Sequence, residues 1–178
     1  MMTEQSGQEQ PIRHIIVAKV ENKFGVLARV TGLFSGRGYN IDSLAVGETE
    51  DPTISKMCIV VSGNEMIIEQ IIKQLNKLID TIEVHDLTDE RHVERGLALI
   101  RQTTTKTFSQ ICHFVDIFKA EIVDVGHEEV IISIQGSEQK IDDFIDLLRP
   151  HGLLEVMRSG TLAMKRSIKA AEKPHDLV

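Results

Sequence analysis

The sequence predicts an α+β protein made of two small domains, each a sheet covered on one face by two helices. Three observations indicate this fold. The 178 residues suffice for one medium domain or two small ones. β-Branched aliphatic residues dominate the apolar set, with 22 Ile and 15 Val, and such residues favour sheet. The order strand, helix, strand, strand, helix, strand also occurs twice along the chain.

The first strand and helix follow a polar N-terminal segment. Residues 14–20 are predicted to form an interior strand, because their apolar stretch is continuous. Over residues 25–35 the apolar side chains recur at spacings that place them on one face of a helix. Gly36 and Gly38 then end the helix. A second extended segment is expected over residues 41–46.

The next strand, helix and strand complete the first unit. A turn at 50–52 precedes a strand over 54–62, and Asn64 is the expected N-cap of a second helix. The apolar face of this helix comprises Ile67, Ile68, Ile71, Ile72, Leu75, Leu78 and Ile79. A fourth strand is expected over 82–87. With right-handed crossovers these six elements fold as a ferredoxin-like βαββαβ sandwich.

The second half repeats this order without detectable identity to the first. Strands are expected over 97–100, 121–125, 130–134 and 153–157. Apolar spacing predicts helices over 108–118 and after Ser137, which is the expected N-cap. The polar run 102–107 is expected to be a loop before the first of these helices. We therefore predict two ferredoxin-like domains.

Composition shifts divide the chain into four parts. Residues 1–12 are expected to be a disordered tail, because they are polar and low in complexity. The first domain is placed at 13–89 and the second at 90–166, with the polar stretch 88–92 as their linker. Residues 167–178 are expected to be a flexible tail.

Charge and composition exclude several classes of function. The formal net charge is −7 and Trp is absent, so the chain lacks the basic surface and the aromatic platform of a nucleic-acid binder. No apolar run approaches the roughly 18 residues of a membrane span, and no targeting segment is recognisable. Cys58 and Cys112 have no CxxC partner, which argues against a disulfide framework or zinc site. We expect a cytoplasmic protein.

No motif of a familiar active site is present. The chain lacks GxxxxGK[ST], GxSxG and HExxH, and its seven His are scattered. Gly36 and Gly38 follow a helix instead of a strand, so they indicate a helix end and not a dinucleotide fingerprint. We therefore expect no catalytic residues, no metal site and no cofactor in this chain.

One segment does predict a binding site. Asn22–Gly25 joins the first strand to the first helix, whose unpaired N–H groups and dipole favour an anion. Gly25 allows a ligand to approach the backbone, and Asn22 offers a donor and an acceptor. A helix start without a ligand is the alternative interpretation.

The second strand is expected at an edge of the sheet, where two copies could pair across a two-fold axis. The loop at Asn22 would then face Asn40 and Ile41 of the second copy. A small amphiphile with a carboxylate, an amine and a short apolar side chain would suit this seam. We therefore expect a homodimer.

The segment Asn22–Ile41, NKFGVLARVTGLFSGRGYNI, with Ser43-Leu44 and Asp51-Pro52, closely resembles the ACT domain of acetolactate synthase regulatory (small) subunits. The second half resembles the C-terminal domain of that family. The segments that carry this second resemblance are His92–Arg95, Leu97–Ile100, Ile117–Asp124 and Gly152–Ala163. The resemblance covers nearly the whole chain from Ile15 to about Arg166.

This resemblance implies a function in branched-chain amino acid biosynthesis. Members of the family activate a large catalytic subunit that carries thiamine diphosphate, Mg2+ and usually FAD. They also confer feedback inhibition by valine or a related amino acid. The family pattern assigns effector binding to a set contributed by two protomers, namely Asn22, Gly25, Val26 and Leu27 of one protomer with Asn40 and Ile41 of the other.

Two other classes of function compete with this interpretation. A free-standing ACT sensor could act on another enzyme, but the GLFSGRGYNI run argues against it. An acylphosphatase has the same fold plan, and Gly25-Val26 with Arg29 loosely resembles its phosphate loop. No phosphate-cradling glycine run surrounds Arg29. A nickel-sensing relative would need clustered His and Cys.

Overall fold

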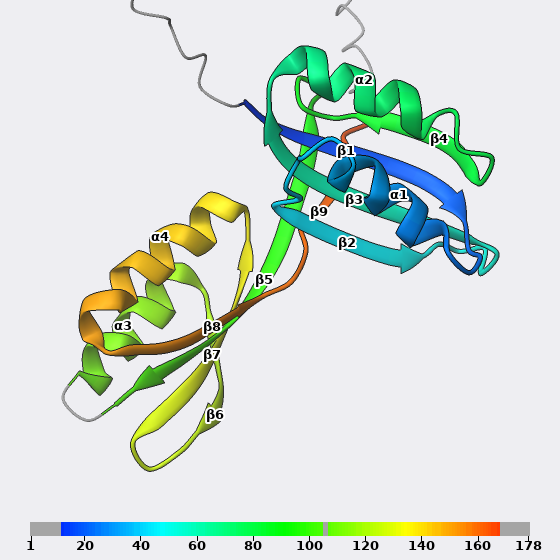
Figure 1. Ribbon diagram of the computed structural model, residues 1–178. Helices are drawn as coiled ribbons and strands as arrows, with labels where there is room; N and C mark the ends of the chain where they lie inside the picture. Colours follow the sequence, from blue (N-terminus) through cyan, green and yellow to red (C-terminus); the bar gives the residue numbers. More distant parts are fainter. Residues whose placement is uncertain (1–11, 105–106, 168–178) are drawn as a thin grey trace, which may run out of the picture.

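The computed structural model describes residues 12–104 and 107–167 (Figure 1). The tails predicted over 1–12 and 167–178 lie outside the described residues, except for one residue of each. Ile12 is the first residue of a strand and pairs with Gly63, so the predicted N-terminal tail is one residue too long. No helix in the described part of the chain is long and apolar enough to cross a membrane.

The first domain is the predicted four-stranded sheet with two helices on one face (Figure 1). Its elements are β1 (Ile12–Glu21), α1 (Val26–Ser35), β2 (Ser43–Glu48), β3 (Ile54–Gly63), α2 (Glu65–Leu75) and β4 (Thr81–Asp86). The antiparallel strands have the order β2-β3-β1-β4, which places β2 at an edge as predicted. Fully buried Ile16, Val30, Phe34, Ile59 and Ile71 fill the space between sheet and helices.

The second domain has the same plan. Its elements are β5 (His92–Thr103), α3 (Phe108–Phe118), β6 (Glu121–Val125), β7 (Glu129–Gly136), α4 (Glu138–Leu148), a short 3-10 helix η1 (Arg149–His151) and β8 (Leu153–Arg158). The strand order is β6-β7-β5-β8. Ile100, Ile132, Phe144 and Leu148 form the centre of its core. The prediction of an α+β protein with two ferredoxin-like domains is therefore confirmed.

The predicted starts of α2 and α4 agree with the structure, whereas the predicted end of α2 does not. Asn64 and Ser137 cap α2 and α4 as predicted, because each side chain accepts a hydrogen bond from a backbone N–H of the first turn. The face predicted for α2 extends too far, since the helix ends at Leu75. Leu78 still packs against the core, whereas Ile79 lies in the following turn and is 95% exposed.

A ninth strand, β9 (Leu162–Lys165), was not predicted. It pairs with His92–Arg95 at the beginning of β5, so that His92, expected in the linker, is already the first residue of a strand. This β5–β9 ribbon lies against the face of the first sheet that the helices leave open (Figure 1). Ala163 packs there against the buried side chains of Ile15, Cys58 and Val60. The C-terminal segment therefore completes the first domain.

Candidate functional site

The loop between β1 and α1 is held in place by the turn between β2 and β3. The backbone N–H of Asn22 donates to the carbonyl of Thr53 at 2.7 Å. The Asn22 side-chain amide donates to Glu48 Oε1 at 3.1 Å and to the Pro52 carbonyl at 2.9 Å. Both donors of Asn22 thus support the loop. Its Oδ1 accepts no hydrogen bond within the described residues and is available to a ligand.

The supporting turn is itself fixed by Asp51. Thr53 donates to Asp51 Oδ1 from its hydroxyl at 2.7 Å and from its backbone N–H at 2.9 Å. These two bonds, with the hydroxyl bond the stronger, lower the pKa of the Asp51 carboxyl. A lowered pKa keeps the carboxylate charged, and able to accept both bonds, until the pH falls below the ordinary range of aspartate.

Gly25 opens the N-terminus of α1. It has φ of 80° in the left-handed region, and no side chain caps the helix. The N–H groups of Leu27 and Ala28 have no acceptor in the described structure, and that of Val26 makes only a long bond of 3.4 Å to the Lys23 carbonyl. These donors point outward with the helix dipole behind them, which is the arrangement that binds an anion.

The six residues predicted to bind the effector form two separate groups within one chain. Asn22, Gly25, Val26 and Leu27 lie together at the end of β2 that carries Glu48. Asn40 and Ile41 precede Ser43 at the other end of β2. Six strand residues put these ends about 17 Å apart. Asn40 is exposed and donates to Asp42, whereas Ile41 is half-buried against the first core.

Sequence reasoning missed Glu48 and Asp80 at this loop and considered Arg29 only as a loose likeness to a phosphate loop. Glu48 accepts a hydrogen bond from the Asn22 amide, in the loop that precedes α1. Arg29 pairs with the nearly buried Asp80 at 2.5 Å, and the Asp80 carbonyl accepts the N–H of Glu21. Only the Asp51-Pro52 turn signal indicated this neighbourhood. No three His, Cys, Asp or Glu side chains are placed to hold a metal ion in the described ranges.

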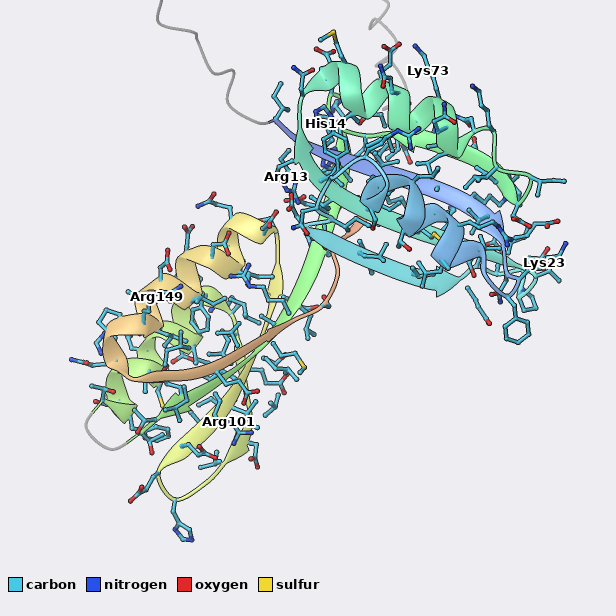
Figure 2. The ribbon with its side chains drawn as sticks, viewed as in Figure 1. Arg13, His14, Lys23, Lys73, Arg101 and Arg149 are labelled. Carbon is cyan, nitrogen blue, oxygen red and sulfur yellow. The ribbon has the colours of Figure 1, made fainter. Side chains whose placement is uncertain are left out.

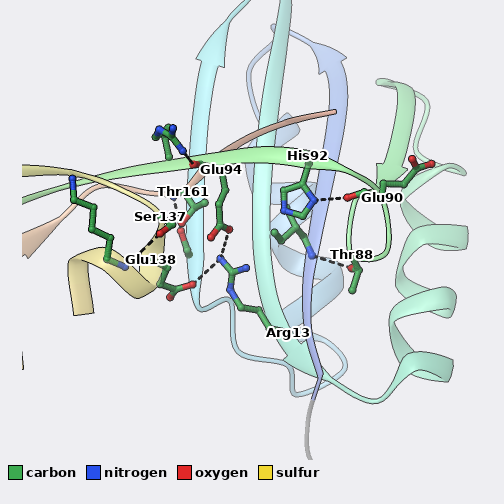
Figure 3. Close-up of polar contacts among 12 residues, drawn as sticks. Arg13, Thr88, Glu90, His92, Glu94, Ser137, Glu138 and Thr161 are labelled. Carbon is green, nitrogen blue, oxygen red and sulfur yellow. Dashed lines mark hydrogen bonds and ion pairs between the residues drawn. The ribbon is translucent and has the colours of Figure 1, made fainter. Parts of the chain in front are cut away.

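The second domain contacts the segment that begins β2. The backbone N–H of Thr161 donates to the Ser43 hydroxyl at 2.8 Å. Gly160 lies so close to β2 that a Cβ on it would be 2.2 Å from the Leu44 carbonyl oxygen. On β1, Arg13 pairs with Glu94 at 3.1 Å and with Glu138 at 2.7 Å (Figure 3). These contacts join both domains beside Asn40 and Ile41.

A ferredoxin-like sheet with a glycine at the start of its first helix and an edge strand beside it is the plan of an ACT domain, here followed by a second domain of the same plan. Residues 16–83 match the AHAS small subunit-like ACT domain, and residues 95–167 match the family described as the small subunit of acetolactate synthase. The chain therefore belongs to the acetolactate synthase small-subunit family.

Individual relatives agree with this assignment. The acetolactate synthase small subunit of Aquifex aeolicus is 45% identical over 92% of this chain and 86% of that protein. The probable acetolactate synthase small subunit of Archaeoglobus fulgidus is 50% identical over 89% of this chain and 99% of that protein. The crystal structure of the small subunit from Thermotoga maritima has a TM-score of 0.80 at 39% identity, covering 88% of this chain and 98% of that one.

Proposed function

We propose that this chain is the regulatory subunit of acetolactate synthase in valine, leucine and isoleucine biosynthesis. It activates the catalytic subunit and confers feedback inhibition by valine or a related amino acid, without catalysing a reaction itself. One observation carries the proposal. The N–H groups that follow Gly25 lack good acceptors within the described residues, and Asn22, in the loop that leads to them, keeps its Oδ1 without a partner there while its amide donates to the carboxylate of Glu48. This arrangement complements the carboxylate and the ammonium of an amino acid.

The effector site requires a second copy of the chain. The edge strand β2 leaves a row of backbone groups unpaired on one side. If two copies pair antiparallel through β2, the Glu48 end of one meets the Ser43 end of the other. The loop of Asn22 then faces Asn40 and Ile41 of the second copy. Asn40 completes the polar contacts, and Ile41 contacts the short apolar side chain of the effector.

The catalytic partner follows from the names of the relatives, which are small subunits of an enzyme. We assign thiamine diphosphate, Mg2+ and the FAD that such enzymes usually carry to the large subunit, and none of them to this chain. Regulation then requires that the complex bind the effector with different affinity in two states, a coupling of typically about 1–3 kcal/mol. Both subunits act in the cytoplasm.

Thermal unfolding of the purified protein against each standard amino acid tests the site. A ligand that binds only the folded state stabilises it by about 2.7 kcal/mol at a hundred times its Kd. We expect a rise in Tm with L-valine, L-leucine or L-isoleucine and none with the corresponding D-amino acids. A flat panel, both alone and with the catalytic subunit added, would contradict the proposed effector site.

Adding the chain to the catalytic subunit of the same organism tests activation. We expect the rate of acetolactate formation to rise, and the raised rate to fall when the effector found by thermal unfolding is added. A free-standing amino-acid sensor would show the same thermal shift but would leave acetolactate formation unchanged. The two functions are thus separated by one assay.

A further inference from the structure

An open groove of about 710 Å³ is lined by residues of the first sheet and of the β5–β9 ribbon. The sheet contributes Val17 and Cys58, and the ribbon contributes Val93, Leu162 and Met164. Val93 pairs with Met164, and Arg95 with Leu162, so that these four side chains share the ribbon face opposite Ala163. The ribbon therefore gives the groove an apolar wall of Val93, Leu162 and Met164 with Arg95 beside it.

Two of these apolar side chains are open to solvent. Leu162 is 63% exposed and Met164 is 70% exposed. A contiguous apolar surface of this kind marks an interaction site in a folded protein. Small-molecule sites enclose most of their ligand, whereas these residues form an outward surface. The geometry therefore favours a protein segment over a small molecule as the occupant.

The charged side chains that line the groove are all positive among the residues that the structure describes. They are Lys56, Arg91, Arg95, Lys165 and Arg166. Only Lys165 has an ion pair within the described residues, with Glu90 at 2.8 Å. The other four cations are exposed and have no carboxylate partner there. In a chain with a net charge of −7, this concentration of unpaired cations singles out one surface.

We propose that this groove, bounded by the first sheet and the β5–β9 ribbon, docks an acidic segment of the catalytic subunit that carries apolar side chains. The inference rests on the proposed function, because it names the surface through which the two subunits associate. Apolar residues of the segment cover Leu162 and Met164, and its carboxylates pair with Arg91 and Arg95. Such complementarity sets both the specificity and the rate of association.

Charge reversal in the groove provides the test. The double variant Arg91→Glu/Arg95→Glu and the single variant Met164→Asp are compared with the unmodified protein in binding to the catalytic subunit. The control is Lys73→Glu/Arg149→Glu, which makes the same change of net charge at exposed helical positions (Figure 2). We expect the Kd to rise about tenfold or more for both groove variants and to stay unchanged for the control. Circular dichroism and Tm confirm that each variant is folded.

The outcomes separate this proposal from the proposed function. If the groove variants bind the catalytic subunit as tightly as the unmodified protein, the groove is not the docking site, although the regulatory function stands. If the unmodified protein itself does not bind, both proposals are overturned. If the groove variants still bind the catalytic subunit but no longer bind a small anion that the unmodified protein binds, the groove is a site for that anion and the docking proposal is wrong.

Discussion

Replacing Gly25 by aspartate is expected to abolish feedback inhibition while leaving the fold intact. Aspartate is among the residues that tolerate the left-handed backbone, here with φ of 80°. A Cβ at this position would lie 3.2 Å from Arg29 Nη1, so the new carboxylate would sit close to the guanidinium and the outward N–H groups. It would occupy the anion site and repel the carboxylate of the effector. Charge-assisted bonds of about 1.5–3 kcal/mol predict a loss of affinity of about 10- to 150-fold.

Gly25→Asn is the matched control, because asparagine has the same shape and the same tolerance of positive φ without the charge. Inhibition curves of the reconstituted enzyme should shift far more for Gly25→Asp than for Gly25→Asn, while activation by both variants stays near that of the unmodified protein. Equal valine sensitivity in Gly25→Asp and the unmodified protein would mean that the anion site is assigned to the wrong residues.

Replacing Gly160 by alanine is expected to destabilise the contact between the two domains. The added Cβ would meet the Leu44 carbonyl oxygen at 2.2 Å and the Ala45 nitrogen at 2.7 Å. These are backbone atoms of a paired strand and cannot rotate away, so either β2 or the junction must move. Overpacking of this kind lowers the free energy of unfolding by about 1–3 kcal/mol. Urea unfolding measures this loss of stability. We also expect the hydrogen bond from the Thr161 N–H to the Ser43 hydroxyl to break.

Gly47→Ala provides the control for this prediction. Gly47 lies in β2, the strand that Gly160 approaches, and a Cβ on Gly47 would have no neighbour within 4 Å. Its substitution should leave the unfolding midpoint nearly unchanged. If Gly160→Ala were equally neutral, the close approach of the junction to β2 would not exist in solution.

The effector response offers a second readout of Gly160→Ala. Gly160 contacts β2 two residues beyond Asp42, whose carboxylate accepts the Asn40 amide. Displacing this segment moves Asn40 and Ile41 relative to the loop of Asn22 in the other copy. We therefore expect the variant to bind its effector more weakly than Gly47→Ala does.

Periodicity and turn chemistry predicted both domains, because the helices have an apolar face and the interior strands a continuous apolar stretch, with turn residues between most of them. Strand ends were less predictable where a polar side chain continues the strand. The sequence predicts that the strand beginning at Leu97 ends at Ile100, yet β5 continues to Thr103. The fully buried Gln102 donates from its amide nitrogen to the His151 carbonyl at 2.6 Å, a partner that is distant in sequence.

Only the part of the candidate site formed by residues close together in sequence could be predicted. Asn22 and Gly25–Leu27 are neighbours in sequence, and the glycine and the helix start together indicate an anion site. The contributions of Glu48 and of Gly160 depend on long-range contacts that carry no sequence pattern. β9 was missed for a related reason, since its four residues, LAMK, are too few to show a period.

The position of β9 also determines when the first domain can finish folding. Ile15, Cys58 and Val60 lie within the first 60 residues of the chain, but their cover, Ala163, is added near the end of the described chain. Translation at about 5–20 residues per second takes roughly 4–15 s to cover the intervening 75 or so residues after β4. During that interval the nascent sheet exposes an apolar face. The newly made chain is then a natural substrate for chaperones, and termination before Leu162 would release an aggregation-prone protein.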